Sequence, residues 1–318
     1  MESLKDAAAD PAPAPRRRLS AEEHRRLARR YRNRQTLRAY AFLAPNLFFF
    51  LLFLVVPCGW LLWTTFHTGG VYTSPEFVGL DNWQQAFADP LVSTTVKNSF
   101  MLALMTIPLL LALGLALALL LRNIGRGGPA LRAALYVPTL TPLVIVGSIW
   151  LFLVHPDFGA LNLGLRAVGA DPVNWVGDTD VAMPTIAMVE IWRGMGFWAL
   201  FFLAALVGLP GELYQAAHLD GAGAWQRFRY LTVPLLRPTF LFAFVVAMFY
   251  SLQIFDTVFI MTDGGPANST ATVSWYIYKS IYVYDQAGFG ATLSFVLLLM
   301  ILAMTLLAFR VLRPRRGR

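Results

Sequence analysis

Two short stretches of the sequence mix aromatic, glycine, hydroxyl and amide residues within runs that are otherwise apolar. They are RGMGF (Arg193–Phe197) and FYSLQI (Phe249–Ile254). Such mixtures bind sugars, because aromatic faces cover the C–H surfaces while polar side chains hydrogen-bond the hydroxyls. The pattern indicates a site for a polyhydroxylated ligand, although Gly194 and Gly196 are also the residue type expected where two helices pack closely.

Three charged residues lie inside the same apolar runs: Glu190, Arg193 and Asp256. Charges at membrane depth are costly and usually functional. Glu190 and Arg193 are three residues apart, so they share a helix face and can form an ion pair. That ion pair could have a role in function, or it could be purely structural. Asp256 lies near the outer end of its run, where we expect a cap or an interfacial hydrogen bond rather than a proton relay.

The sequence carries no recognisable catalytic constellation. None of the four histidines (His24, His67, His155 and His218) has a partner at metal-ligand spacing, and the single cysteine, Cys58, lies in an apolar run. Neither the hydrolase pattern G-x-S-x-G nor the phosphate-loop pattern G-x-x-x-x-G-K-[ST] occurs. We therefore expect no catalytic residue, no metal ligand and no cofactor, so that any ATP would be bound by another subunit.

The composition places these residues in a membrane. Of 318 residues, 57% are hydrophobic and 14% charged, whereas soluble domains carry roughly a quarter charged residues. Six apolar runs reach the ~20 residues that a helix needs to cross the hydrocarbon core. They cover about 41–65, 99–121, 133–154, 183–208, 236–260 and 291–311. The sequence thus predicts an all-α membrane protein with six transmembrane helices.

The positive charges predict how these helices are oriented. Lys plus Arg number 11, 1, 3, 1, 3, 1 and 5 in the segments before, between and after the runs. Because positive residues stay cytoplasmic, both termini should be cytoplasmic, and the net charge of +8 needs no nucleic acid. Arg193 and Ser251 then both lie about ten residues, or roughly 15 Å, below the outer surface. The two mixed stretches should meet near the middle of the ~30 Å core.

The loop between the fourth and fifth runs, expected to be cytoplasmic, is predicted to contain helical structure rather than a simple turn. ELYQAAHLD predicts a short helix, Gly221 ends it, and AWQRFRYL predicts a second short helix. We expect Gly221 to let the chain reverse where a side chain would clash. The small residues Ala216 and Ala217 would allow a partner protein to approach closely. A helix that lies on lipid is the alternative, but such helices show bulky anchors where these alanines stand.

This loop resembles the EAA loop of bacterial binding-protein-dependent ABC importers, whose pattern is E-A-A-x-x-x-G with a hydrophobic residue and a proline downstream. Here it reads Gln215-Ala216-Ala217-His218-Leu219-Asp220-Gly221-Ala222, followed by Val233-Pro234. Gln215 replaces the usual glutamate and so removes a charge. FVGLDNW, IWRGMGF and IFDTVFIMTDGGPANST are similar to carbohydrate-importer permeases related to the maltose and glycerol-3-phosphate systems. The resemblance covers most of the chain.

The resemblance implies the type I ABC importer permease fold, with a cytoplasmic coupling helix, in a bacterial cytoplasmic membrane. The implied partners are a second homologous permease, two ATPase subunits, an extracytoplasmic solute-binding protein and a carbohydrate substrate. The implied contacts to the ATPase fall on Gln215, Ala216, Ala217, Asp220, Gly221 and Ala222. The implied contacts to the substrate fall on Arg193, Gly194, Phe197, Tyr250, Ser251, Gln253 and Ile254.

We therefore divide the chain into a basic cytoplasmic segment (1–40), a membrane domain (41–311) with its coupling loop at 209–234, and a cytoplasmic tail (312–318). An ion- or proton-coupled secondary transporter is the alternative. Such proteins use inverted repeats, broken helices and buried carboxylates, and Glu190 is the serious candidate for the last. A membrane-embedded enzyme would need a nucleophile–base pair or a metal constellation. Arg193 would favour an anionic substrate, and a partner at Glu190 would cancel that preference.

Overall fold

A computed structural model of the chain describes residues 21–70, 73–122, 124–125 and 127–312. Residues 1–20 of the predicted N-terminal segment and 313–318 of the predicted tail lie outside the described residues. The chain divides into two compact units, Met1–Trp60 and Leu61–Arg318. Most described residues of both units are helical, as the composition predicts.

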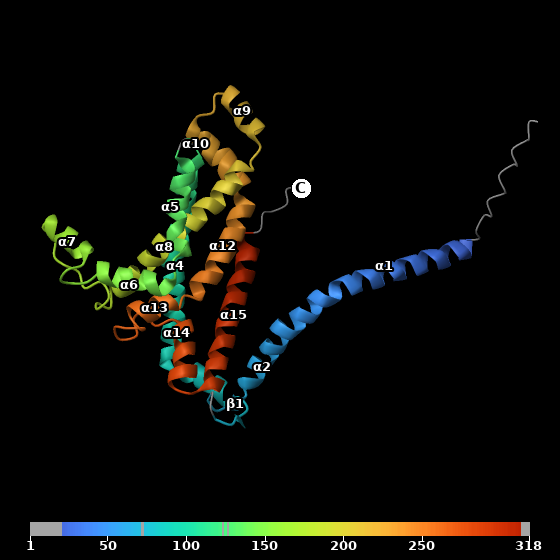
Figure 1. Cartoon of the computed structure of the whole chain (residues 1–318), viewed down its shortest axis with the longest axis horizontal. Coiled ribbons are helices and arrows are strands. Elements are labelled where there is room, and N and C mark those ends of the chain that lie inside the picture. The colour runs from blue at the N-terminus through green and yellow to red at the C-terminus, as the bar shows by residue number, and fades with distance from the viewer. Residues whose placement is uncertain (1–20, 71–72, 123, 126, 313–318) are drawn as a thin grey trace, which may run out of the picture. The chain divides into compact units, whose positions relative to one another are not determined.

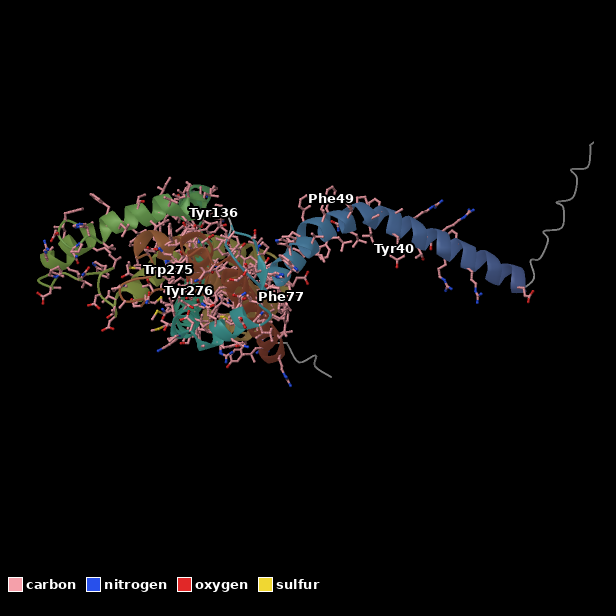
Figure 2. All side chains as sticks on the ribbon, turned by 90° about the horizontal axis from the view of Figure 1, so that it is seen from below. Tyr40, Phe49, Phe77, Tyr136, Trp275 and Tyr276 are labelled. Carbon is pink, nitrogen blue, oxygen red and sulfur yellow. The ribbon has the colours of Figure 1, made fainter. Side chains whose placement is uncertain are left out.

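The described residues of the first unit, 21–60, form one long helical stretch. Here α1 (Ala21–Phe50) continues through the π-helical turn η1 (Leu51–Val55) into α2 (Val56–Thr64), of which the last four residues belong to the second unit. The apolar side chains described in the first unit are exposed, including Tyr40 and Phe49 (Figure 2). An apolar helix without its own core needs lipid or another protein around it, as expected of the first predicted run.

The second unit contains the remaining elements, of which only two are short strands that pair antiparallel. They are β1 (His67–Thr68), β2 (Glu76–Phe77), α3 (Asp81–Ala88), α4 (Pro90–Arg122), α5 (Gly128–Leu140), α6 (Leu143–Leu153), α7 (Ala160–Ala167), α8 (Ala182–Val207), α9 (Gly211–Leu219), α10 (Ala224–Arg227), η2 (Phe228–Thr232), α11 (Val233–Leu235), α12 (Arg237–Leu252), α13 (Asp256–Met261), α14 (Val273–Tyr278), η3 (Lys279–Val283) and α15 (Ala287–Leu312).

Five stretches of the described residues are long and apolar enough to cross a membrane, and they match five of the six predicted runs. They are Arg34–Thr64, Pro90–Arg122, Ala182–Val207, Arg237–Met261 and Ala287–Arg310. In Figure 1, α4, α12 and α15 run alongside one another, with the loop that carries α9 at one end and the loop that carries α14 at the other.

The third predicted run, 133–154, is not one straight helix. Its residues form α5 and α6, which are bent by 96° (Figure 1). The bend follows from Pro142, which has no N–H to continue the helix and drives the preceding Thr141 into an extended conformation (φ −74°, ψ 133°). The described chain therefore has six spans only if this bent pair counts as one.

The fifth span is also interrupted. Its first helix, α12, ends at Leu252, and α13 begins only at Asp256. No glycine or proline stands in the break, residues 253–255. Instead, the hydroxyl of Thr272 donates a 3.0 Å hydrogen bond to the carbonyl of Ile254, which satisfies one of the groups that the break frees.

The core of the second unit lies where α4 meets α8, with α5 and α12 packed onto this pair. Leu102, Phe202 and Met248 are fully buried there. Gly196 allows the close approach of α5, because a Cβ atom at this position would fall on the carbonyl of Leu135. For Gly196, the packing interpretation is therefore correct.

The loop between α13 and α14 is held by Asp263. Its carboxylate accepts hydrogen bonds from the indole of Trp275 and the ammonium of Lys279, both at 2.9 Å. Partial burial acts to raise the pKa of Asp263, but the two hydrogen bonds and the charge of Lys279 outweigh it and lower the pKa below its usual value. The TDGGP segment (262–266) thus folds back onto α14. Figure 2 shows Trp275 and Tyr276 among the packed side chains of this unit.

Tyr276 fastens α14 to the start of α4. Its hydroxyl donates a 2.6 Å hydrogen bond to the carboxylate of Asp89, the residue just before α4. Burial and the negative charge of Asp89 raise the pKa of Tyr276 above its usual range, so the hydroxyl stays protonated as a donor. Together with Asn98 of α4, which donates to the carbonyls of Asn268 and Ala271, this contact makes the loop part of the folded unit.

Candidate functional site

A cavity of about 470 Å³ opens between α4, α5, α8 and the interrupted fifth span. All seven residues that the resemblance assigned to the substrate line it: Arg193, Gly194, Phe197, Tyr250, Ser251, Gln253 and Ile254. The two mixed stretches therefore meet in space, as their matched depth predicts. The break in the fifth span is what turns Gln253 and Ile254 toward the cavity, because these two residues belong to its non-helical part.

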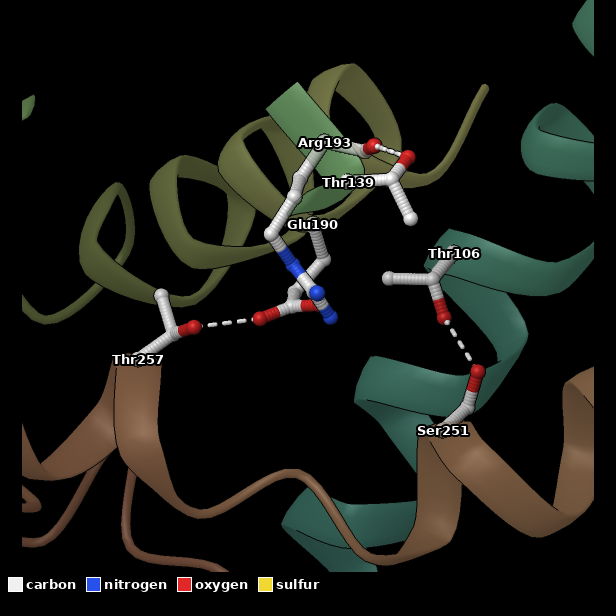
Figure 3. A network of polar contacts seen from close by, with 6 residues as sticks. All are labelled: Thr106, Thr139, Glu190, Arg193, Ser251 and Thr257. Carbon is white, nitrogen blue, oxygen red and sulfur yellow. Dashed lines mark hydrogen bonds and ion pairs between the residues drawn. The ribbon is translucent and has the colours of Figure 1, made fainter. Parts of the chain in front are cut away.

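Glu190 and Arg193 form the predicted ion pair in this cavity. A guanidinium nitrogen of Arg193 (Nη2) lies 3.2 Å from Glu190 Oε2. The other oxygen of Glu190 accepts a hydrogen bond from the hydroxyl of Thr257 at the start of α13 (Figure 3). The pair thus connects α8 with the far side of the break. Both side chains are largely buried, with 25% of Arg193 and 10% of Glu190 exposed, so solvent screens their attraction only weakly.

Two further contacts hold the polar residues of the cavity in place (Figure 3). The hydroxyls of Thr106 in α4 and Ser251 in α12 lie 3.2 Å apart, and the hydroxyl of Thr139 in α5 donates to the backbone carbonyl of Arg193 at 2.8 Å. Ser251 is buried, whereas Tyr250 is 67% exposed and Phe197 37% exposed. The accessible part of the lining in this chain therefore includes these two aromatic rings, together with the exposed side chains of Gln253 and Asp256.

Sequence reasoning missed four polar residues of the lining: Thr106, Tyr136, Thr139 and Thr257. They stand on α4, α5 and α13, outside the two mixed stretches, and only the packing of these helices brings them to the cavity. Asp256 lines the cavity as well. It begins α13 as a first-turn acid, and its side chain is exposed.

The predicted helix–glycine–helix elbow is present as α9, Gly221 and α10, and we call residues Gly211–Arg227 the elbow. Gly221 has φ +78°, a conformation that other residues adopt at a cost. It ends α9 in a Schellman motif, in which its N–H donates to His218 O (3.1 Å) and the N–H of Ala222 donates to Ala217 O (2.9 Å). The spacing from Ala217 to Gly221 is thus the spacing of a helix C-terminus.

One expectation about Gly221 was wrong. A Cβ atom at this position would meet nothing within 4 Å in this chain. The glycine is required by the backbone conformation, not by a neighbouring group. Ala216, Gln215 and Asp220 are exposed, and Ala217 and Ala222 are half-buried. Leu219, at the end of α9, is 87% exposed. An exposed apolar side chain of this kind is favourable at a protein–protein contact.

The fold and the two sites define a class of protein: a helical membrane subunit whose bundle encloses a cavity lined by aromatic, aliphatic and polar side chains, with an exposed helical elbow at one end. The sequence profile of the family described as "Binding-protein-dependent transport system inner membrane component" matches residues 98–316. The chain belongs to this family.

Individual relatives agree. The sulfoquinovosyl glycerol transport system permease protein SmoG of Agrobacterium fabrum is 32% identical over 281 residues, 88% of this chain and 91% of SmoG. The trehalose/maltose transport system permease protein MalF of Thermococcus litoralis is 30% identical over 293 residues, 91% of this chain and 98% of MalF. The crystal structure of a bacterial ABC transporter that imports the acidic polysaccharide alginate contains a chain of the same fold. It matches with a TM-score of 0.76 and 22% identity, over 92% of this chain and all of that one.

The chain is therefore an inner-membrane, multi-pass permease subunit of a binding-protein-dependent ABC importer, and the predicted all-α membrane fold of the ABC importer permeases is confirmed. The comparisons give no support to the ion- or proton-coupled secondary transporter. The broken fifth span, a feature expected of that alternative, occurs here in an ABC importer permease.

Proposed function

We propose that this permease imports a sugar or a sugar derivative, and that Arg193, Gly194, Phe197, Tyr250, Ser251, Gln253 and Ile254 line its half of the path. The observation that carries the proposal is the cavity itself, in which exposed aromatic rings stand beside hydroxyl and amide groups. That combination suits the C–H faces and hydroxyls of a sugar. The relatives named above transport sulfoquinovosyl glycerol and trehalose/maltose by their names.

The energy for import comes from ATP bound by separate subunits. In this proposal the elbow seats in an ATPase subunit through Gln215, Ala216, Ala217, Asp220, Gly221 and Ala222. A lever must be stiff to transmit motion, and the Schellman motif stiffens this one. The exposed Leu219 and the small exposed Ala216 are the features that favour a close protein contact over solvent.

The same proposal includes the other subunits of the importer and the orientation of this chain in the membrane. A second homologous permease completes the path, two ATPase subunits drive it, and an extracytoplasmic solute-binding protein delivers the substrate. Both termini are cytoplasmic, so 1–40 and 312–318 flank a membrane domain at 41–311, with the coupling loop at 209–234. The alternating Lys and Arg counts support this orientation.

The test is to measure sugar uptake by the reconstituted importer that carries the Tyr250→Ala variant of this chain. We expect uptake to fall about tenfold, the equivalent of about 1.4 kcal/mol, because the most exposed ring of the lining is lost. Phe249→Ala is the matched control, since Phe249 is a neighbouring exposed aromatic outside the cavity lining. Both variants should still co-purify with the ATPase. Unchanged uptake and unchanged substrate-stimulated ATP hydrolysis in Tyr250→Ala would mean that this residue faces lipid or a packing contact.

A further inference from the structure

The charges of the cavity bear on the kind of sugar that it accepts. Three residues of its described lining have ionisable side chains: Glu190, Arg193 and Asp256. Two are acidic and one is basic, so the formal charge of this wall of the cavity is one net negative. The family and the fold leave the charge of the substrate open, because the relatives range from trehalose/maltose permeases to an importer of an acidic polysaccharide.

Arg193 is the group that would attract an anion, and its charge is already offset. Its Nη2 lies 3.2 Å from Glu190, which is itself fixed by Thr257, while its buried Nε has no hydrogen-bond partner among the described residues. An anionic substrate would therefore meet a guanidinium whose charge is offset by a carboxylate of the same helix, three residues away. Separating the pair would leave the buried Glu190 carboxylate without its counter-charge, which is strongly unfavourable.

Asp256 acts in the same direction. Its carboxylate is exposed at the cavity, and no described residue forms an ion pair or a side-chain hydrogen bond with it. An anionic substrate in a cavity of this size would be repelled by the Asp256 carboxylate. This repulsion is stronger inside a protein than in water. The uncharged part of the lining, in contrast, offers hydroxyls, an amide and aromatic rings that an uncharged sugar can use.

We propose that the wall of the path built by this chain selects for an uncharged saccharide and against a carboxylated, sulfonated or phosphorylated one. The inference rests on the proposed function, sugar import. It assigns Glu190 the role of a residue that cancels the charge of Arg193, and Asp256 the role of a residue that repels anions.

The experiment uses the purified complex of both permeases and the ATPase subunits, without the solute-binding protein, so that the selectivity of that protein does not enter. Equilibrium binding is measured for two probes of similar size, maltose and a digalacturonate. We expect maltose to bind more tightly to the wild type. In Glu190→Gln, which keeps an acceptor for Thr257 but frees the charge of Arg193, the ratio of the two dissociation constants should shift toward digalacturonate by about tenfold.

Further variants separate charge from structure. Asp256→Asn should shift the ratio in the same direction as Glu190→Gln, and Arg193→Gln should shift it the opposite way. Glu76→Gln, which removes an exposed carboxylate on β2, outside the cavity lining, should leave the ratio unchanged. A wild type that prefers digalacturonate, or an unchanged ratio in both Glu190→Gln and Asp256→Asn, would overturn this inference and leave sugar import standing. Binding of neither probe nor of any other saccharide would overturn the sugar proposal and this inference with it.

Discussion

The hydroxyl of Tyr214 in α9 lies 2.9 Å from the hydroxyl of Thr232 in η2. Thr232 is buried, with 4% of its surface exposed, so this contact anchors the exposed elbow to the packed start of the fifth span. The ring of Tyr214 also lies under Arg122, whose guanidinium carbon is 5.2 Å from the ring centre at the end of α4. One side chain therefore joins the elbow to the end of α4 and to η2, which leads into the fifth span.

We expect Tyr214→Phe to loosen the elbow without unfolding it. The substitution removes one hydrogen bond, worth about 1 kcal/mol, and keeps the ring under Arg122. If the elbow transmits motion from the ATPase, more ATP should be hydrolysed per sugar imported, while ATPase co-purification stays normal. The ratio of hydrolysis to uptake in proteoliposomes is the measurement.

The matched control for Tyr214→Phe is Tyr230→Phe, because Tyr230 is a 72% exposed tyrosine in η2 with no side-chain hydrogen bond to a described residue. It should leave the ratio unchanged. A double-mutant cycle with Thr232→Val adds a second criterion. The two effects should be non-additive, since either substitution removes the same bond. Additive effects would show that Tyr214 and Thr232 act separately.

The elbow was predictable because its determinants are local. A helix-forming stretch, a glycine and a second short helix follow one another in the sequence, and the positive φ of Gly221 needs no distant contact. The apolar runs were predictable for a similar reason, since crossing a membrane depends on length and composition. The ion pair between Glu190 and Arg193 likewise follows from a spacing of three residues in a helix.

Most of what the sequence did not reveal depends on distant contacts. The bend at Pro142 is an exception, because its cause is local, but hydropathy alone joins α5 and α6 into one run. The break at 253–255 contains no glycine or proline, and it is accompanied by the hydrogen bond from Thr272, 18 residues beyond Ile254. Thr106 and Thr139 stand outside the two mixed stretches, and only helix packing brings them to the cavity.

The loop between α13 and α14 should loosen in acid. The pKa of Asp263 is lowered in the folded loop, so its contribution to stability is present above its unfolded pKa, about 3.9. That contribution is lost as the pH falls through the lower folded value. Hydrogen exchange of residues 262–272 in nanodiscs, corrected for the intrinsic effect of pH, should report the loosening.

Lys279→Met provides the matched test of this pH effect. The variant removes a hydrogen bond and a positive charge that lower the pKa of Asp263, and leaves burial, which raises it. The loosening should therefore begin at a higher pH than in the wild type. The same pH midpoint in both proteins would contradict the role of Lys279.

Cysteine labelling should place the two ends of the bundle on opposite sides of the membrane. Cys58 is exposed and is first replaced by serine. In right-side-out vesicles, an impermeant maleimide should then label Ala267→Cys in the loop after α13 and not Ala224→Cys at the start of α10. Both positions are exposed, so burial does not explain a difference. Inside-out vesicles should reverse the result, and labelling of Ala224→Cys alone from outside would contradict the orientation.

Substitutions of Gly221 should separate the backbone requirement from the contact with the ATPase. Because a Cβ atom at Gly221 meets nothing in this chain, Gly221→Ala and Gly221→Leu carry the same cost within it, about 1 kcal/mol for the positive φ. Gly221→Asn should cost less, since asparagine adopts this conformation more readily. Gly223→Ala is the matched control, because Gly223 has φ −67° and a Cβ atom there makes only ordinary contact.

If the elbow seats in a groove of the ATPase, Gly221→Leu should reduce ATPase co-purification and uptake far more than Gly221→Ala does. Equal behaviour of the two variants would mean that nothing packs against Gly221 and would contradict the seating of this residue in a groove.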